Sequence, residues 1–294
     1  MKHHLFIVAA LAAVLLASCS SEDELSQKSY PIDNQVRIKA KVSSVKALPG
    51  YISSTLENFG LSIINPVNSR TTFQNVKVEK SEADGSWMPK EQLRWNNVTD
   101  TLDITACAPY SEDNYYFIGV GDYKVSVEKD QSDADNYNAS DLMFFYKLAF
   151  IPEEDLESDG TLGIEFEHYM SQLNFTVKFS KQREQKDYYT SNPISRLVVC
   201  GAKINGECNF TVEPPTVTAT GSQETVFALE SANFKAETAT TPAKAYYSCF
   251  LIPQSFEPNK FAIELVTNNG TVRRCALSSV DFEKGRSYEI YLDY

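Results

Sequence analysis

Alternation of apolar and polar residues constrains the fold of this chain more than any other feature of its sequence. Within residues 36–42, Val36, Ile38, Ala40 and Val42 are apolar, and the three residues between them are basic. A strand that buries one face has this period of two. The same period recurs in residues 76–80, 123–127, 164–168, 173–179, 261–266 and 288–292. Helical periodicity is almost absent, so the sequence predicts an all-β protein.

Turn dipeptides separate the alternating segments. They are Asp84-Gly85, Asp159-Gly160, Asn205-Gly206, Asn269-Gly270 and Lys284-Gly285. Short strands punctuated in this way favour β-sandwiches over βαβ units. We expect one short helical turn within residues 50–59. The polar segment 180–193 is the best candidate for a linker, so we expect two tandem β-sandwich domains, at residues 36–182 and 183–294.

The N-terminus has the features of an export signal. Lys2 precedes an apolar run at residues 5–17, which is too short to span a bilayer as a mature helix. The run ends in Leu16-Ala17-Ser18-Cys19, which resembles the lipobox of bacterial lipoproteins, where the cysteine is acylated and becomes the new N-terminus. Each buried CH₂ of an acyl chain contributes about 0.8 kcal/mol, so a multiply acylated Cys19 would anchor the chain firmly to the outer membrane. The alternative is an ordinary signal peptide with an incidental cysteine.

Residues 1–18 are therefore interpreted as a lipoprotein signal peptide, and residues 19–35 as an acidic tether. The acidic run after Cys19 also resembles the signal that carries some lipoproteins to the outer face of the outer membrane, with a plain solvated tether as the alternative. The formal net charge is −12, from 39 acidic and 27 basic residues, and no basic cluster follows Lys2. This pattern argues against nucleic acid as a partner.

The sequence offers little material for catalysis. Of its three histidines, only His168 lies beyond the leader, and it continues the alternation of Ile164 and Phe166, which predicts a buried histidine with a hydrogen-bond partner. Glu165 and Glu167 alternate with them, as residues on a solvated face do. A histidine metal site, a hydrolytic triad and a phosphate-binding loop all lack the residues they need. We therefore expect neither enzymatic activity nor a cofactor.

Five cysteines remain beyond Cys19, and most of them lie in apolar runs that are typical of buried thiols. Cys200 and Cys208 flank Asn205-Gly206, so they could face one another across a hairpin. Buried free thiols are nevertheless favoured over a disulfide framework.

Aromatic residues allow a second interpretation of function. Trp87 and Trp95, with Tyr110, Tyr115 and Tyr116, could form a platform on which sugars stack, and they could equally fill the core and rim of a sandwich. A glycan-binding surface lipoprotein of a polysaccharide-uptake system is therefore the alternative function.

Several short motifs follow one another in a fixed order. They are Asp84-Gly85-Ser86-Trp87, Leu93-Arg94-Trp95, residues 103–110, Asp141-Leu142-Met143, residues 162–173, Ile252-Pro253-Gln254, Phe261 with Ile263, and Gly285 with Tyr288. Together with the lipobox, this order resembles the fimbrillin (type V pilin) family of fimbrial lipoproteins. The resemblance covers essentially the whole mature chain.

This resemblance implies two transthyretin-like β-sandwich domains, no catalysis and a place in a surface fimbrium. Family subunits reach the outer membrane as lipoproteins, and a trypsin-like protease then removes their first strand. The vacated groove accepts a strand from the next subunit, which is β-strand addition. Here the removable strand would contain Val36, Ile38, Ala40 and Val42. Ile290 and Leu292 would lie near the donor end, and the partners would be other fimbrial subunits and surface receptors.

Two departures from the family pattern bear on the position in the fimbrium. No arginine lies between Val42 and Phe59, so Lys46 and the later Arg70 are the candidate processing residues. The chain also stops at Tyr294, directly after a predicted strand, without an appendage to donate. These departures favour a tip or accessory subunit, and an uncleaved anchor that keeps its lipid remains open.

Overall fold

The structure is a computed structural model that describes residues 30–43, 55–68, 73–112, 122–179, 189–210, 212 and 214–294. Cys19, Lys46, Arg70, Tyr115, Tyr116 and most of the expected linker lie outside the described residues. Within them, strands dominate, and the helices are α1 (Ala134–Ala139) and α2 (Pro152–Asp155). No helix in the described part of the chain is long and apolar enough to cross a membrane. The predicted all-β class is confirmed.

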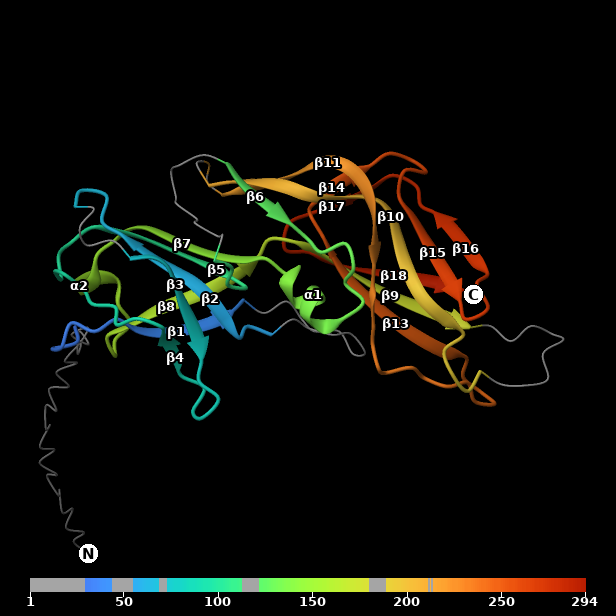
Figure 1. Ribbon diagram of the computed structural model, residues 1–294, viewed down its shortest axis with the longest axis horizontal. Coiled ribbons are helices and arrows are strands. Elements are labelled where there is room, and N and C mark those ends of the chain that lie inside the picture. The colour runs from blue at the N-terminus through green and yellow to red at the C-terminus, as the bar shows by residue number, and fades with distance from the viewer. Residues whose placement is uncertain are drawn as a thin grey trace, which may run out of the picture.

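The first half of the chain forms a closed barrel, which we call the N-terminal barrel (Figure 1, left). Its strand order is β1-β4-β3-β2-β5-β7-β8. The strands are β1 (Arg37–Val42), β2 (Asn58–Ile64), β3 (Phe73–Lys80), β4 (Trp87–Pro89), β5 (Leu102–Ala108), β7 (Met143–Phe150) and β8 (Thr161–His168).

The second half forms the C-terminal sandwich (Figure 1, right). One sheet contains β11 (Thr216–Phe227), β10 (Ile194–Asn209), β15 (Ala262–Thr267) and β16 (Val272–Ala276), and β6 (Asp122–Ser126) also pairs with β10. The other contains β12 (Leu229–Glu230), β13 (Ala243–Leu251), β9 (Ser171–Phe179) and β18 (Ser287–Asp293). A small sheet joins β14 (Gln254–Phe256) to β17 (Val280–Phe282).

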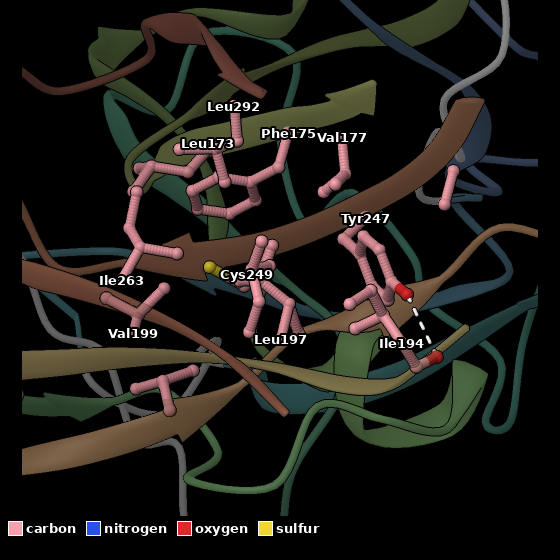
Figure 2. Packing of buried hydrophobic residues seen from close by; sticks show 14 of the residues in the cluster. Leu173, Phe175, Val177, Ile194, Leu197, Val199, Tyr247, Cys249, Ile263 and Leu292 are labelled. Atoms are coloured by element: carbon pink, nitrogen blue, oxygen red, sulfur yellow. Dashed lines mark hydrogen bonds between the residues drawn. The ribbon is translucent and has the colours of Figure 1, made fainter. Parts of the chain in front are cut away.

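Alternating side chains fill the space between the two sheets. Leu173, Phe175 and Val177 of β9 point toward Leu197 and Val199 of β10, and all of them are buried (Figure 2). The barrel has its own core, which includes Phe59, Val78, Ile104 and Phe166. A third buried cluster joins the two regions, with Tyr137 of α1, Phe144 of β7, Cys208 of β10 and Phe250 of β13 among its members.

Strand pairing does not follow the expected boundary at residue 182. Strand β9 precedes that boundary, yet it pairs with β13 and β18 of the C-terminal sandwich. Strand β6 likewise precedes it and pairs with β10. The alternation in each segment identifies a strand correctly, but it carries no information about which sheet the strand joins.

Four of the five turn dipeptides are confirmed, with Gly85, Gly160, Gly270 and Gly285 at positive φ between strands or before one. The prediction for Asn205-Gly206 is wrong, because β10 continues through it. A Cβ on Gly206 would come within 2.8 Å of the Thr218 carbonyl oxygen, so close packing rather than a turn requires this glycine.

Two further expectations change with this result. Cys200 and Cys208 lie on the same strand, so they do not face each other across a hairpin, and each is a buried cysteine outside any disulfide. The helical turn expected within residues 50–59 is also not observed where the structure describes that segment, because β2 begins at Asn58. The remaining residues of the segment, 50–54, are outside the described part.

Candidate strand-exchange site

Strand β1 is held unequally by its two neighbours. On one side it runs parallel to β8 over six paired positions, from Arg37↔Thr161 to Val42↔Phe166. On the other side it pairs with the short strand β4 at Ile38↔Trp87 alone among the strands described. The β8 side therefore supplies most of the backbone hydrogen bonds that keep β1 in the barrel.

The inner face of β1 closes the barrel core. Ile38 is 8% exposed, and Ala40 and Val42 are partly buried and pack on the same core, as does Val36 directly before β1, which is 6% exposed. This confirms the alternation predicted for residues 36–42. Because the core beneath includes fully buried aromatic rings, such as Phe166, removal of β1 would expose a long apolar groove.

The two tryptophans have different positions, and neither forms an open platform for sugars. The Trp87 indole N–H donates to the Ala40 carbonyl oxygen at 3.1 Å, and its ring lies 5.1 Å from that of Phe59. Trp95 is 2% exposed and stacks on Phe150 at 5.7 Å. The expectation that Trp95 contacts a glycan is wrong, because its faces are covered by the barrel core. Trp87 is half-buried and acts as a link between β4 and β1.

The outer face of β1 carries three cations, and each has a carboxylate partner. Arg37 Nη2 lies 2.7 Å from Asp33 Oδ2, and Lys41 Nζ lies 2.9 Å from Glu165 Oε2. Lys39 forms an ion pair with Asp159. Hydrogen bonding from Lys39 is the main cause that lowers the pKa of Asp159 to about 2. These pairs are exposed to solvent, so each contributes little to stability.

Strand β18 is the other terminal strand, and it lies at the edge of its sheet. It runs parallel to β9 over seven paired positions, from Ser287↔Gln172 to Asp293↔Lys178. Leu292 is 9% exposed and Ile290 is partly buried, and both pack on the sandwich core. Both residues named as the donor end thus have inward positions within their own molecule.

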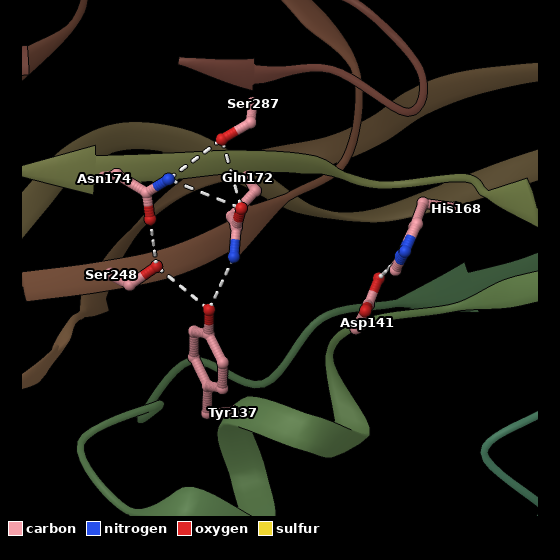
Figure 3. Close-up of polar contacts among 7 residues, drawn as sticks. All are labelled: Tyr137, Asp141, His168, Gln172, Asn174, Ser248 and Ser287. Atoms are coloured by element: carbon pink, nitrogen blue, oxygen red, sulfur yellow. Dashed lines mark hydrogen bonds and ion pairs between the residues drawn. The ribbon is translucent and has the colours of Figure 1, made fainter. Parts of the chain in front are cut away.

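A polar network fixes the start of β18 (Figure 3). Asn174 Nδ2 donates to Ser287 Oγ at 2.8 Å, and Ser248 Oγ donates to Asn174 Oδ1 at 2.7 Å. Tyr137 shares a 2.9 Å hydrogen bond with Ser248 and accepts another from Gln172. Burial raises the pKa of Tyr137, so its hydroxyl stays protonated. The sequence carries no separate signal for this network, because Asn174 occupies a polar position of the alternating strand β9.

The far end of β18 is fixed by aromatic contacts. The ring of Tyr294 lies 5.6 Å from that of Phe179, and the Arg273 guanidinium lies 4.0 Å above the Tyr294 ring. Cation–π and edge-to-face contacts of this kind stabilise by about 0.5–1.5 kcal/mol each. Strand β18 is therefore anchored at both ends.

His168 is hydrogen-bonded, as predicted, although it does not share the full burial of Ile164 and Phe166. Its Nδ1 lies 2.8 Å from Oδ1 of Asp141, a fully buried carboxylate (Figure 3). This hydrogen bond joins the end of β8 to the segment that follows α1, so His168 has a structural role. Among the described residues, no three metal-ligating side chains converge.

The sheets and the parallel pairing of β1 and β18 define an all-β protein in which a barrel is followed by a sandwich. The chain belongs to the fimbrillin-like family, whose sequence profile matches residues 54–294. Strand β1 lies outside that match. A fimbrial family implies a cell-surface location, contacts with other fimbrial subunits and a structural role.

Solved structures share this fold. A candidate cell adhesion protein from Bacteroides uniformis aligns with a TM-score of 0.58 and 16% identity, over 90% of this chain and 94% of that one. A candidate cell adhesion protein from Bacteroides ovatus aligns with a TM-score of 0.56 and 16% identity, over 90% and 92% of the respective chains. At these identities the likeness shows the fold alone. A search of curated proteins finds no match to the sequence.

Proposed function

We propose that this protein is a subunit of a surface fimbrium, at its tip or in an accessory position, that assembles by strand exchange and contributes to adhesion. The observation that carries the proposal is the position of β1. It is the first strand of the described residues, it closes an apolar core, and it pairs with β8 at six positions and with β4 at one.

Loss of β1 would create a site that favours another strand. Six positions of β8 would lose their partners, and the core beneath Ile38 would meet water. Exposed strand edges and apolar grooves attract extended segments, since main-chain hydrogen bonds give affinity and alternating side chains fill the groove. A strand from another subunit would restore both.

The positions of the two candidate processing residues are not equivalent. Lys46 follows β1, so a cut there separates β1 and leaves the other barrel strands in one chain. Arg70 lies between β2 and β3, so a cut there would also separate β2, whose Phe59 and Leu61 are fully buried. We therefore favour Lys46. Before the cut, the acylated Cys19 would hold the subunit at the outer membrane.

The contacts that hold β18 in its own molecule support a tip or accessory position in the fimbrium. Its seven paired positions, its polar network and the Tyr294 contacts engage it fully in its own sandwich. A shaft subunit must accept one strand and donate another, whereas a tip subunit only accepts. Ile290 and Leu292 are thus retained by this molecule in the proposal.

N-terminal sequencing of the protein in purified fimbriae tests the proposal. We expect an N-terminus at residue 47, and we expect Lys46→Gln to block both this processing and entry into fimbriae. Arg70→Gln is the matched control and should leave both unchanged. A fimbrial fraction that contains only the form beginning at lipidated Cys19 would contradict strand exchange and favour a permanent anchor.

A further inference from the structure

The outer face of β1 carries a charge pattern that the apolar groove alone does not explain. Arg37, Lys39 and Lys41 are all basic and all exposed, and they pair with the carboxylates of Asp33, Asp159 and Glu165. The last two carboxylates belong to β8 and to the turn before it, and they would stay with the barrel after β1 leaves. Asp33 precedes β1 and would leave with it.

Asp159 and Glu165 form an acidic wall beside β1, and Glu157 extends it. Its carboxylate lies over Gly163, because a Cβ on that glycine would come within 2.7 Å of Glu157 Oε1. Gly163 is the β8 residue paired with Lys39. Glu157 and Glu165 line one surface groove together with Lys39 and Lys41. The wall beside the vacated site therefore contains Glu157, Asp159 and Glu165.

We propose that this acidic wall selects a donor strand with basic residues at its outward positions, and that the donor is a different protein rather than a second copy of this chain. The inference rests on the proposed strand exchange and adds the chemistry of the partner. A donor with Lys or Arg at alternate outward positions would replace the cations of β1, whereas an acidic donor would place like charges side by side.

The chain's own last strand does not have the required pattern. Tyr288, Ile290 and Leu292 of β18 point inward, while Glu289 and Asp293 are exposed on the outer face with Tyr291. If β18 of a second copy inserted its apolar side chains into the groove, its outward carboxylates would face the acidic wall. This holds for either strand direction, since none of the outward residues is basic. The electrostatics therefore oppose donation of β18 by a second copy.

Peptide exchange into the cleaved full-length protein tests the inference. The recognition sequence of a site-specific protease is inserted after Lys46. Cleavage there leaves β1 bound to the barrel but no longer covalently joined to it. Three labelled peptides then compete with β1: residues 35–43, the same peptide with Arg37→Glu, Lys39→Glu and Lys41→Glu, and residues 286–294. We expect the native basic peptide to bind about tenfold more tightly than either acidic one, because several exposed charge pairs change sign together. The difference should shrink in 1 M salt.

Substitutions in the protein identify the carboxylates that cause the difference in affinity between the peptides. Asp159→Asn with Glu165→Gln should narrow the difference between the peptides, while Glu257→Gln with Asp281→Asn, an equal change of net charge on the C-terminal sandwich, should leave it intact. Equal binding of basic and acidic peptides would overturn the charge selection while supporting strand exchange. Failure of every peptide to displace β1 would overturn strand exchange, and the inference with it.

Discussion

The first and last strands of the molecule share a topology but are held by different forces. Strand β1 runs parallel to β8, and β18 runs parallel to β9, whereas every other pairing between the strands described is antiparallel. Exposed ion pairs flank β1. Buried and part-buried hydrogen bonds fix the start of β18, and the contacts of Tyr294 with Phe179 and Arg273 fix its end.

The interactions that retain a strand in its sheet therefore differ from those that select which strand binds. An exposed ion pair contributes at most about 1 kcal/mol and is weakened by salt, whereas a broken buried hydrogen bond leaves a desolvated group that costs about 1–3 kcal/mol. The ends of β18 thus resist displacement, while the charges on β1 set which strand fits without holding it strongly. The two strands are therefore suited to opposite roles, β1 to exchange and β18 to permanence.

The largest expected effect tests whether the cores under the two strands are equivalent. Phe166 is paired with Val42 of β1, Phe175 is paired with Ile290 of β18, and both rings are fully buried. Phe166→Ala and Phe175→Ala should each lower the free energy of unfolding by about 3–5 kcal/mol, measured by urea denaturation. If one substitution costs less than half as much as the other, the difference between the strands begins in the cores and not at their ends.

The next effect concerns the buried anchor of β18. Ser287→Ala removes the nearer of two acceptors of the Asn174 amide, which is almost fully buried, so it should cost about 1–3 kcal/mol and speed amide hydrogen exchange along β18. Ser86→Ala is the control, because Ser86 bonds to Asp84 in an exposed turn. Unchanged exchange in β18 after Ser287→Ala would show that the polar network does not hold the strand, and that its pairing with β9 and its aromatic end are sufficient.

Sequence reasoning identified most strand faces correctly but not how the strands combine. The inward positions of Ile38, Leu173 and Leu292 follow from alternation, because side-chain direction in a strand is set locally. The pairing of β9 with strands of the C-terminal sandwich does not follow from alternation, because pairing is decided by residues far apart in the sequence. The Asn205-Gly206 error has the same origin, since the neighbour that requires Gly206 lies on another strand.

In the candidate site, too, some residues could be predicted from the sequence and others could not. The residues of β1 could be named in advance, because a first strand with strict alternation is visible in the sequence. The roles of Trp95 and Asn174 could not be predicted, because burial against Phe150 and bonding to Ser248 depend on long-range packing. The acidic wall was also missed, since Glu157, Asp159 and Glu165 gain their meaning only beside β1.

A smaller effect is expected where β4 contacts β1. Trp87→Phe keeps an aromatic ring near Phe59 but loses the indole hydrogen bond to the Ala40 carbonyl, which should cost about 0.5–1.5 kcal/mol. In the protein cleaved after Lys46, β1 should then dissociate several-fold faster, as measured by the release of a label. Met88→Leu on the same strand is the control, because Met88 is 58% exposed. An unchanged release rate would mean that β8 alone holds β1.

The smallest effect is electrostatic and depends on pH. Hydrogen bonds from Lys39 and then from Thr161 lower the pKa of Asp159 from 3.8 to about 2 in the folded protein, and the Lys39 part is lost when β1 leaves. A lowered carboxyl pKa stabilises the folded arrangement above the unfolded value, and the contribution is lost as the pH falls from about 4 towards 2. Release of β1 from the cleaved protein should therefore accelerate over this range, and Asp159→Asn should weaken that dependence and speed release slightly at pH 7, because it removes the same ion pair. Because Asp141 is buried and bonded to His168 away from β1, Asp141→Asn is the control that should lower overall stability without removing the dependence. If Asp159→Asn left the acid dependence of release intact, the Lys39 pair would have no part in holding β1, and the pair of Lys41 with Glu165 would be the ion pair left to join β1 to β8.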